Sequence, residues 1–260
     1  MLILAVETSG KNGGVALARG DGNQFELLQE SPIGAGQYSA ELMPRIVELL
    51  EKARISKNDL DGIAVASGPG SFTGLRVGIA TVKGLADTLQ KPLAAVSVLE
   101  AIAATAQAAQ GPITADDRAE RERKLQRETM VALMDAGRGE VYVGLYGLEF
   151  PMRQHGPRSQ VMRGLTPVTE LLLPLEEVPE RIGRLTPDPI TIATPDDKIA
   201  AWLRDQEVSV LPVPRPGAGE IARLGVEKLA RGETEPVAEL DANYIRRSDA
   251  EIFSLPKLRK

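Results

Sequence analysis

The sequence predicts an α/β fold in which a mixed sheet is flanked by helices, followed by a second unit that starts in the same way. Three apolar strand patterns come first, at residues 2–6, 15–19 and 24–30. Helix and strand patterns then alternate as far as residue 110. A run of consecutive strands followed by such alternation is typical of a mixed sheet with helices on its faces. Residues 130–148 repeat the pattern of residues 1–18, which predicts the second unit.

The first unit contains a polar, glycine-rich turn at residues 7–14, between its first two strands. Asp21-Gly22 is typical of a hairpin turn before the third strand. The helix pattern at 38–54 contains Pro44, which predicts either a kink or the first helical turn at that point. Ser97 is expected to cap the third helix. The remaining elements expected in this unit are strands at 61–66 and 92–96 and helices at 73–89 and 97–110.

The most informative stretch is residues 67–84, SGPGSFTGLRVGIATVKG. Pro69 fixes φ, and the glycines beside it accept positive φ, so a tight turn is expected between strand and helix. Ser71 or Thr73 can cap the helix by accepting a backbone N–H bond. Apolar residues then recur at helical spacing to about residue 89.

The same helix carries Gly74, Gly78 and Gly84. Each glycine inside a helix costs about 1 kcal/mol relative to alanine, so the helix needs a compensating close contact. One interpretation is that its small face packs on its own sheet. The other is that a second backbone or a ligand approaches that face. We favour the second interpretation.

The second half opens with a charged run at residues 116–128, for which a solvated helix or a flexible insert is expected. A strand at 129–134 follows. In the repeated hairpin, Asp135 matches Glu7 and Arg138 approximately matches Lys11. Two hairpins can also look alike by chance, and the sequence leaves that alternative open.

Beyond the second hairpin we expect short helices at 166–173 and 175–185, strands at 189–193 and 207–211, helices at 196–206 and 218–231, and an extended proline-rich linker at 212–216. A cap is expected from Thr194 or from Pro195-Asp196. From Leu240 onward the chain has little periodicity and is locally basic, through Arg246, Arg247, Lys257, Arg259 and Lys260. A solvated tail is expected there, with a tail that binds a partner or RNA as the alternative.

The expected organisation is therefore a first domain at 1–110, a charged insert at 111–128 and a smaller second domain at 129–216. A helix at 217–232, which can return to the first domain, and a C-terminal tail at 233–260 complete it.

Composition excludes several classes of function. The formal net charge of −5 argues against uniform phosphate binding, which needs a basic face. Without cysteine there is no disulfide or thiolate chemistry, which fits a reducing compartment. The single histidine, His155, lies in a polar loop and is expected to be an ordinary surface residue, so a site with two histidine ligands is excluded. No signal peptide or membrane-spanning run is recognisable, and we expect a cytoplasmic protein.

The strand order and the two acidic hairpin turns together resemble the actin/Hsp70/sugar-kinase superfamily. In that fold, two related domains face each other, and their hairpin turns hold nucleotide phosphates through backbone N–H groups and hydroxyls. This resemblance implies a vestigial phosphate-binding role for Glu7, Thr8, Ser9, Lys11, Asp135 and Arg138.

Six segments carry a closer resemblance, to the TsaB (YeaZ) family: ILAVETS, SAELMPRIVELL, SGPGSFTGLRVGIATVKGLA, PLAAVSVLEAIA, MDAGRGEVYVGLY and NYIRR. They extend from residue 2 to about residue 247, and GPGSFTGLRVG is the most specific. The resemblance implies an accessory subunit in the synthesis of threonylcarbamoyladenosine in transfer RNA. It also implies a heterodimer with the transferase TsaD, a ternary complex with the P-loop ATPase TsaE and a homodimer when alone. Contact with tRNA is expected only through the complex.

The same resemblance implies that this chain is not itself the enzyme. In TsaD, two metal-binding histidines follow the strand that matches residues 92–96. Aligned on this sequence, they fall at Val98 and Ile102, whose aliphatic side chains do not bind metal ions. The strand end at residues 192–197 also lacks the glycine-rich adenosine segment of superfamily ATPases, and Glu7 stands where the family more often has Asp. No cofactor is expected to be required, although ADP or ATP shared with TsaD at the interface is compatible with the family.

The resemblance places the TsaD contact on the helices at 38–54 and 73–89. The residues expected at this interface are Leu42, Ile46, Ser71, Phe72, Thr73, Gly74, Arg76, Gly78, Thr81 and Val82. Two alternatives remain open. One is a stand-alone ATP-binding enzyme of the kinase-like superfamily, and the other is an RNA-binding module that uses Arg246, Arg247 and the tail.

Overall fold

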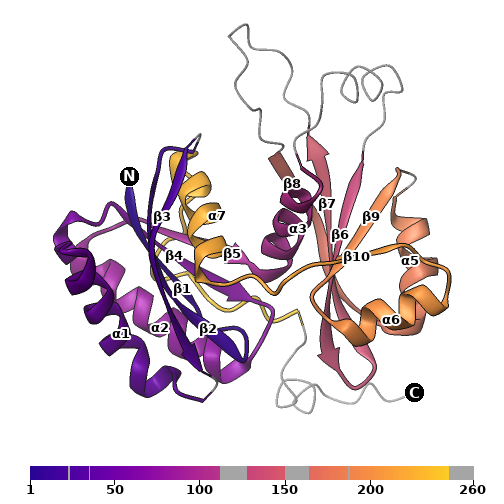
Figure 1. The fold of residues 1–260 in the computed structure, drawn as a ribbon, viewed down its shortest axis with the longest axis horizontal. Coiled ribbons are helices and arrows are strands. Elements are labelled where there is room, and N and C mark those ends of the chain that lie inside the picture. Colours follow the sequence, from indigo (N-terminus) through magenta and orange to yellow (C-terminus); the bar gives the residue numbers. More distant parts are fainter. Residues whose placement is uncertain (23, 35, 112–127, 150–163, 187, 246–260) are drawn as a thin grey trace, which may run out of the picture.

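The structure is a computed structural model that describes residues 1–22, 24–34, 36–111, 128–149, 164–186 and 188–245. It contains two five-stranded mixed sheets, and we refer to the parts built on them as the first and second domains (Figure 1). Residues 112–127 of the predicted insert at 111–128, His155 and the tail from Arg246 onward lie outside the described residues. Within the described ranges, no helix is both long enough and apolar enough to cross a membrane.

The first sheet has the order β3-β2-β1-β4-β5. β1 (Leu2–Glu7), β2 (Asn12–Gly20) and β3 (Phe25–Gly34) form an antiparallel meander. β4 (Gly62–Gly68) and β5 (Leu93–Ser97) then add in parallel on the other side of β1. β1 and β4 are buried along their whole length because helices cover both faces of the sheet.

The second sheet has the order β10-β9-β6-β7-β8, which is the same topology. β6 (Thr129–Gly137), β7 (Glu140–Glu149) and β8 (Gly164–Pro174) form the meander. β9 (Ile190–Thr194) and β10 (Val210–Pro212) add in parallel beside β6. The repeat of the first hairpin by the second is therefore a repeat of the whole sheet. The predicted α/β fold class, two related domains that each have a mixed sheet flanked by helices, is confirmed.

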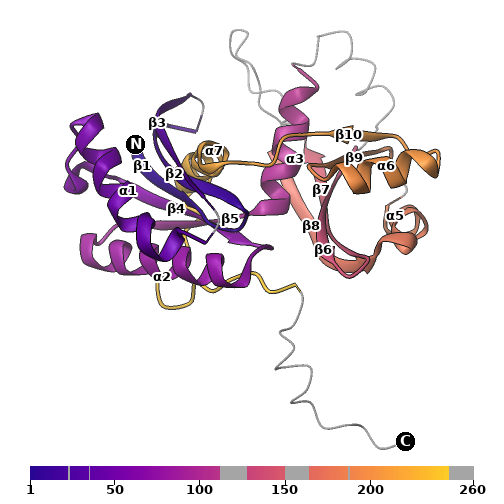
Figure 2. The ribbon, with the colours of Figure 1, turned by 60° about the horizontal axis from the view of Figure 1, so that its bottom comes forward.

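Helices α1 (Tyr38–Ala53) and α2 (Phe72–Leu89) lie side by side on one face of the first sheet (Figures 1 and 2). Leu4, Val6 and Val65 of the sheet pack against Leu42 and Leu75 in the apolar core beneath them. Pro44 lies within α1, which begins six residues before it, so Pro44 does not mark the first turn.

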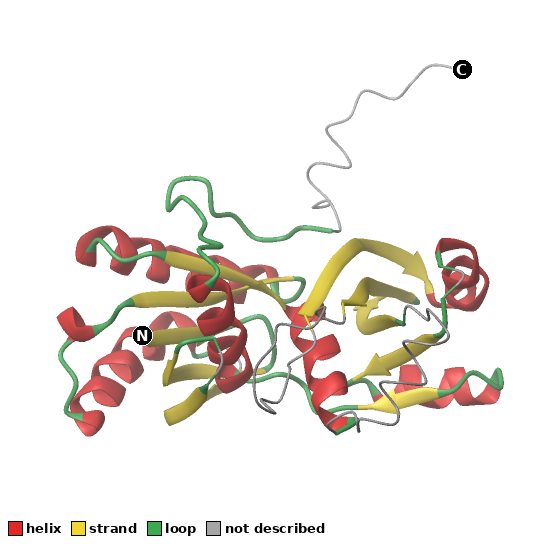
Figure 3. Ribbon diagram, turned by 90° about the horizontal axis from the view of Figure 1, so that it is seen from above, coloured by secondary structure: helices red, strands yellow, loops and turns green. Residues whose placement is uncertain are grey.

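The opposite face of the first sheet is covered by α3 (Val98–Ala109) and α7 (Ala218–Ala230). α7 packs across β1, β2 and β4, after the chain has returned from the second domain. α3 packs against β6, β7 and β8 of the second sheet and also contacts β4 and β5 of the first (Figure 3). One continuous aliphatic core, rich in alanine, therefore joins the two domains.

The second domain has a smaller core of its own on its other face. α5 (Val178–Leu185), preceded by a 3₁₀ turn at Leu175–Glu177, contributes Val178 and Ile182. α6 (Asp197–Asp205) contributes Ile199 and Leu203. The expected helix at 175–185, strand at 189–193 and helix at 196–206 are thus present, with ends shifted by a few residues.

One predicted element is wrong. Residues 166–173 form most of strand β8 and not a short helix. The whole of β8 pairs with β7, from Gly164 opposite Glu149 to Pro174 opposite Glu140. The β-branched residues Thr166, Val168 and Thr169 favour a strand locally, and the meander supplies the pairing partner.

The chain after α7 differs from the expected solvated tail as far as the structure follows it. Leu240 and Ala242 are buried in the core beneath α1 and α2. Lys83 Nζ donates hydrogen bonds to the carbonyl oxygens of Ala238 (3.1 Å) and Leu240 (3.0 Å). We refer to residues 236–245 as the C-terminal strap, because they lie along α2 and are tied to it.

Candidate functional site

The turn between β1 and β2, residues 8–11, is held by hydrogen bonds to Glu7, the acidic residue that precedes it. Glu7, Thr8 and Ser9 are buried. Glu7 Oε1 accepts hydrogen bonds from both the backbone N–H of Ser9 (2.7 Å) and the Ser9 hydroxyl. On the far side of the turn, the Tyr38 hydroxyl donates to Gly10 O (2.8 Å), and Ser71 N donates to Ser9 O (2.7 Å). Polar groups that hold phosphate in nucleotide-binding relatives of this fold are therefore engaged inside the protein.

The glycines of α2 explain how this turn is buried. A Cβ at Gly74 would overlap the backbone oxygen of Thr8, and one at Gly78 would overlap the Thr8 hydroxyl. Ser71 caps the helix, with Gly74 N donating to Ser71 Oγ at 3.2 Å. The glycine cost of α2 is therefore offset by close packing on the β1–β2 turn of the same chain.

Burial has an electrostatic consequence at this turn. Desolvation raises the pKa of the Glu7 carboxyl, while the Ser9 hydrogen bonds and the charge of Arg215 oppose the shift. Burial and the nearby Glu7 carboxyl together raise the pKa of Tyr38 to about 12. Among the described buried atoms, Glu7 Oε2 and Thr8 Oγ1 have no hydrogen-bond partner. Such orphaned polar atoms carry a desolvation penalty that the rest of the domain must offset.

Arg215 is a site residue that the sequence did not single out. It belongs to the linker at 212–216, and its Nη2 donates to Ser9 Oγ at 3.5 Å. A Cβ at Gly10 would lie 2.7 Å from Arg215 Nε, so the guanidinium lies directly against the turn. A lone charged residue between two prolines of a rigid linker is the signal that could have identified it.

The equivalent turn in the second domain, between β6 and β7, is open to solvent. Asp135 is exposed there, and its Oδ1 accepts a hydrogen bond from Gly137 N at 2.7 Å. The backbone N–H of Asp135 donates to Asp196 Oδ2 (2.8 Å) at the start of α6. Asp196 is the N-terminal cap residue of α6, but its side chain bonds across to this turn and not to its own helix.

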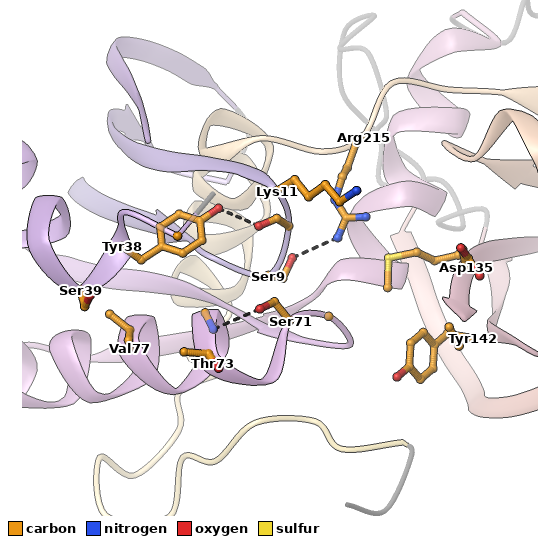
Figure 4. Close-up of a pocket in the computed structure, with 16 residues that line it drawn as sticks. Ser9, Lys11, Tyr38, Ser39, Ser71, Thr73, Val77, Asp135, Tyr142 and Arg215 are labelled. Carbon is orange, nitrogen blue, oxygen red and sulfur yellow. Dashed lines mark hydrogen bonds between the residues drawn. The ribbon is translucent and has the colours of Figure 1, made fainter. Parts of the chain in front are cut away.

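The two turns face each other across a cavity of about 460 Å³ between the domains (Figure 4). Its walls come from β1–β2, α1, the start of α2, β6–β7 and the linker. The side chains labelled in Figure 4 are Ser9, Lys11, Tyr38, Ser39, Ser71, Thr73, Val77, Asp135, Tyr142 and Arg215.

The structure brings together three of the six residues predicted to bind phosphate. Ser9, Lys11 and Asp135 line the cavity. Glu7 and Thr8 are buried behind the first turn, and Arg138 is not among the residues that line the cavity. The described residues do not match the superfamily's phosphate clasp, because carboxylates of the chain already accept hydrogen bonds from Ser9 N, the Ser9 hydroxyl and Gly137 N.

The predicted interface residues divide into two groups. Ser71, Phe72, Thr73 and Arg76 are exposed on α2, and Thr81 is half-buried. The other five face inward and are not available to a partner, which corrects the prediction: Leu42, Ile46, Gly74, Gly78 and Val82 are buried. The exposed apolar side chains on α1 are instead Met43 and Val47, with 45% and 47% of their surface accessible.

The two positions aligned with the transferase histidines lie in the core. Val98 and Ile102, on α3, are 2% and 0% exposed, in the cluster that joins the domains. Within the described part of the chain, no group of three or more His, Cys, Asp or Glu side chains is arranged to hold a metal ion.

Comparison with known proteins shows which proteins the chain resembles. The model of a family described as TsaD, tRNA N6-adenosine threonylcarbamoyltransferase, matches residues 32–150. The chain is 29% identical to the tRNA threonylcarbamoyladenosine biosynthesis protein TsaB of Escherichia coli, and this alignment covers 96% of each protein. It is 36% identical to the TsaB protein of Bacillus subtilis over 56% of this chain and 55% of that protein. The chain is thus similar to a TsaB protein over nearly its whole length.

A solved structure shows the same similarity. YeaZ from Pseudomonas aeruginosa superposes with a TM-score of 0.62 at 26% sequence identity, covering 93% of this chain and all of that one. The match extends over both sheets, so the family resemblance includes the second domain as well as the glycine-rich helix.

Proposed function

We propose that this chain is a non-catalytic subunit in the synthesis of N6-threonylcarbamoyladenosine in tRNA, where it binds and activates the TsaD transferase and supports the binding of TsaE. Its similarity to proteins of tRNA threonylcarbamoyladenosine biosynthesis supports the role in tRNA modification. The buried aliphatic residues Val98 and Ile102, in place of metal ligands, support an accessory role. The transferase chemistry and any contact with tRNA would then belong to the complex.

The surface that we propose for binding TsaD is the exposed face of α1 and α2. Met43 and Val47 lie one helical turn apart on α1, and Phe72, at the start of α2, is 43% exposed. Val77, half-buried on α2, adds apolar surface next to the cavity. Exposed apolar side chains on two adjacent helices are suited to pack against a similar helix pair. TsaD, whose family model matches this part of the chain, has the related sequence that such a pairing needs. The same face would support a homodimer when the chain is alone.

The test replaces the two large exposed hydrophobic residues of α1 with charged ones, as Met43→Glu with Val47→Glu. Burying carboxylates in an apolar interface should weaken binding to TsaD by roughly thirtyfold or more, about 2 kcal/mol. Isothermal titration calorimetry measures the affinity, and light scattering after size-exclusion chromatography measures the homodimer.

Leu185→Glu is the matched control, because Leu185 is 45% exposed but lies on α5 of the second domain. It should leave both associations unchanged. TsaD affinity that is unaltered in the α1 double variant would overturn the proposed interface. Modification of tRNA by TsaD and TsaE, with and without this chain, then tests activation directly.

We also propose that the chain requires no cofactor of its own, and that any ADP or ATP in the assembly is held jointly with TsaD. Two observations support this proposal. The backbone N–H groups of Ser9 and Gly137 already donate to carboxylates of the chain, and Arg215 lies against Gly10. Titration of the isolated chain with ATP and Mg²⁺ should give no binding heat. Micromolar binding by the chain alone would favour an independent ATP-binding enzyme.

A further inference from the structure

The carboxylate of Glu170, on strand β8, joins three segments that are far apart in the sequence. Its Oε1 accepts hydrogen bonds from the Ser97 hydroxyl and from the Tyr146 hydroxyl (2.5 Å). Its Oε2 accepts a hydrogen bond from Asn243 Nδ2 (2.5 Å). Hydrogen bonds to an ionised carboxylate are among the stronger polar contacts in proteins. One side chain of the second domain therefore holds two segments outside that domain.

Two of these partners lie at strand ends of the first sheet. Ser97 ends β5 and caps α3, accepting hydrogen bonds from Leu99 N and Glu100 N. The backbone N–H of Asn243 donates to Ser67 O (2.7 Å), one residue before the end of β4. Glu170 thus bridges the second sheet to the ends of two adjacent strands of the first sheet.

Asn243 belongs to the C-terminal strap, and the next residue contacts the start of α2. The rings of Tyr244 and Phe72 are 5.4 Å apart. Arg76 stacks over Phe72 at 3.7 Å and donates through Nε to the Tyr244 hydroxyl (3.1 Å). A continuous path of contacts therefore leads from Glu170 through Asn243 and Tyr244 to the exposed end of α2.

We propose that Glu170 is a positioning residue that couples the placement of the second domain to the α2 surface through the C-terminal strap. While Glu170 holds Asn243, the strap keeps Tyr244 against Phe72, and the two sheets keep one relative placement. Loss of the carboxylate frees the strap and loosens the domains together. The effect on a partner rests on the proposed binding of TsaD at the α1–α2 face, whereas the coupling within the free chain does not.

The coupling is tested first in the free chain, which has no cysteine and so accepts specific labels. Spin labels at Glu51→Cys on α1 and Lys198→Cys on α6, both exposed positions, report the distance between the domains. Glu170→Gln keeps the size of the side chain but turns an N–H group toward its donors. We expect a broader distance distribution and amide exchange of residues 240–245 that is roughly tenfold faster or more.

Asn243→Ala, which breaks the link at its other end, should produce the same two changes, and combining it with Glu170→Gln should add little. Glu176→Ala is the control, because it removes an exposed carboxylate of the second domain. Unchanged distances in both variants, even with faster exchange in the strap, would overturn the coupling.

TsaD affinity gives the second readout. Glu170→Gln should weaken TsaD binding severalfold without touching the α1 face. Unchanged affinity together with loosened domains would overturn the link to the partner surface. If Met43→Glu with Val47→Glu leaves TsaD binding intact, the proposed interface fails, while the distance measurement on the free chain still decides the coupling.

Discussion

The two hairpin turns occupy equivalent places in the two sheets but differ in burial. In the first domain, Glu7 and Ser9 are almost completely buried. In the second, Asp135 is exposed. Both turns use a carboxylate to accept backbone N–H bonds, from Ser9 in one and from Gly137 in the other. The difference therefore lies in what covers each turn and not in its local hydrogen bonding.

The helix that follows the fourth strand of each sheet accounts for this difference. α2 approaches the first turn so closely that Gly74 and Gly78 leave no room for a side chain. α6, the equivalent helix, contains no glycine, and Asp196 at its start accepts a hydrogen bond from the backbone N–H of Asp135 in its turn. The same topology thus gives a buried turn where glycines let the helix approach closely, and a solvent-exposed turn where the helix has no glycine.

The largest expected effect comes from filling the contact between α2 and the first turn. Gly78→Leu should destabilise the first domain by about 3 kcal/mol, because the side chain would overlap the Thr8 hydroxyl. Gly84→Ala is the matched control in the same helix. No atom lies within 4 Å of a Cβ there, so this change should stabilise the helix by up to about 1 kcal/mol.

Urea unfolding followed by two probes can separate the domains. Far-UV circular dichroism reports the whole chain, and Trp202 on α6, the single tryptophan of the sequence, reports the second domain. The Gly78→Leu transition should move to lower urea by circular dichroism and shift less by Trp202 fluorescence. Equal tolerance of Gly78→Leu and Gly84→Ala would show that the close approach of α2 is not what buries the turn.

The fold was predictable because strands, helix caps and hairpins each have a recognisable pattern within a short stretch of sequence. Ser71 and Ser97 cap the helices that the sequence assigned to them. The error at 166–173 arose because LTPVTELLLP contains good helix formers as well as β-branched residues, and pairing with β7 decides between them.

The site was less predictable, since contacts between distant segments decide it. The glycines of α2 indicated a close approach, but not that Thr8 of the same chain makes it. Helical spacing marked Leu42 and Ile46 as one face of α1, but that face is the inner one. Glu170 bonds to residues more than 70 positions away and gave no local signal, whereas the local signal of Arg215, a charge between two prolines, did not reveal its partner Ser9.

A smaller effect is expected in the pH dependence of the free energy of unfolding, which should differ between the acidic residues of the two turns. The pKa of Glu7 is raised by burial, so the folded chain keeps a proton that the unfolded chain releases. Stability should therefore fall as the pH rises above the unfolded-state pKa of glutamate, until it passes the folded-state pKa. Glu7→Gln removes this titration. The free energy of unfolding of the variant, relative to the natural chain, should be higher at about pH 8 than at about pH 4.

Urea unfolding at the two pH values measures the difference, and Asp135→Asn controls for removing one carboxylate from the exposed turn. Gln keeps an oxygen for Ser9 N, so the first turn retains its backbone hydrogen bond. The amide also replaces Glu7 Oε2, which has no partner in the buried turn, with a neutral group. A benefit of Glu7→Gln that is the same at both pH values, or larger at the lower one, would contradict a buried, desolvated Glu7. The two turns would then differ in shape but not in the electrostatic cost of their acidic residues.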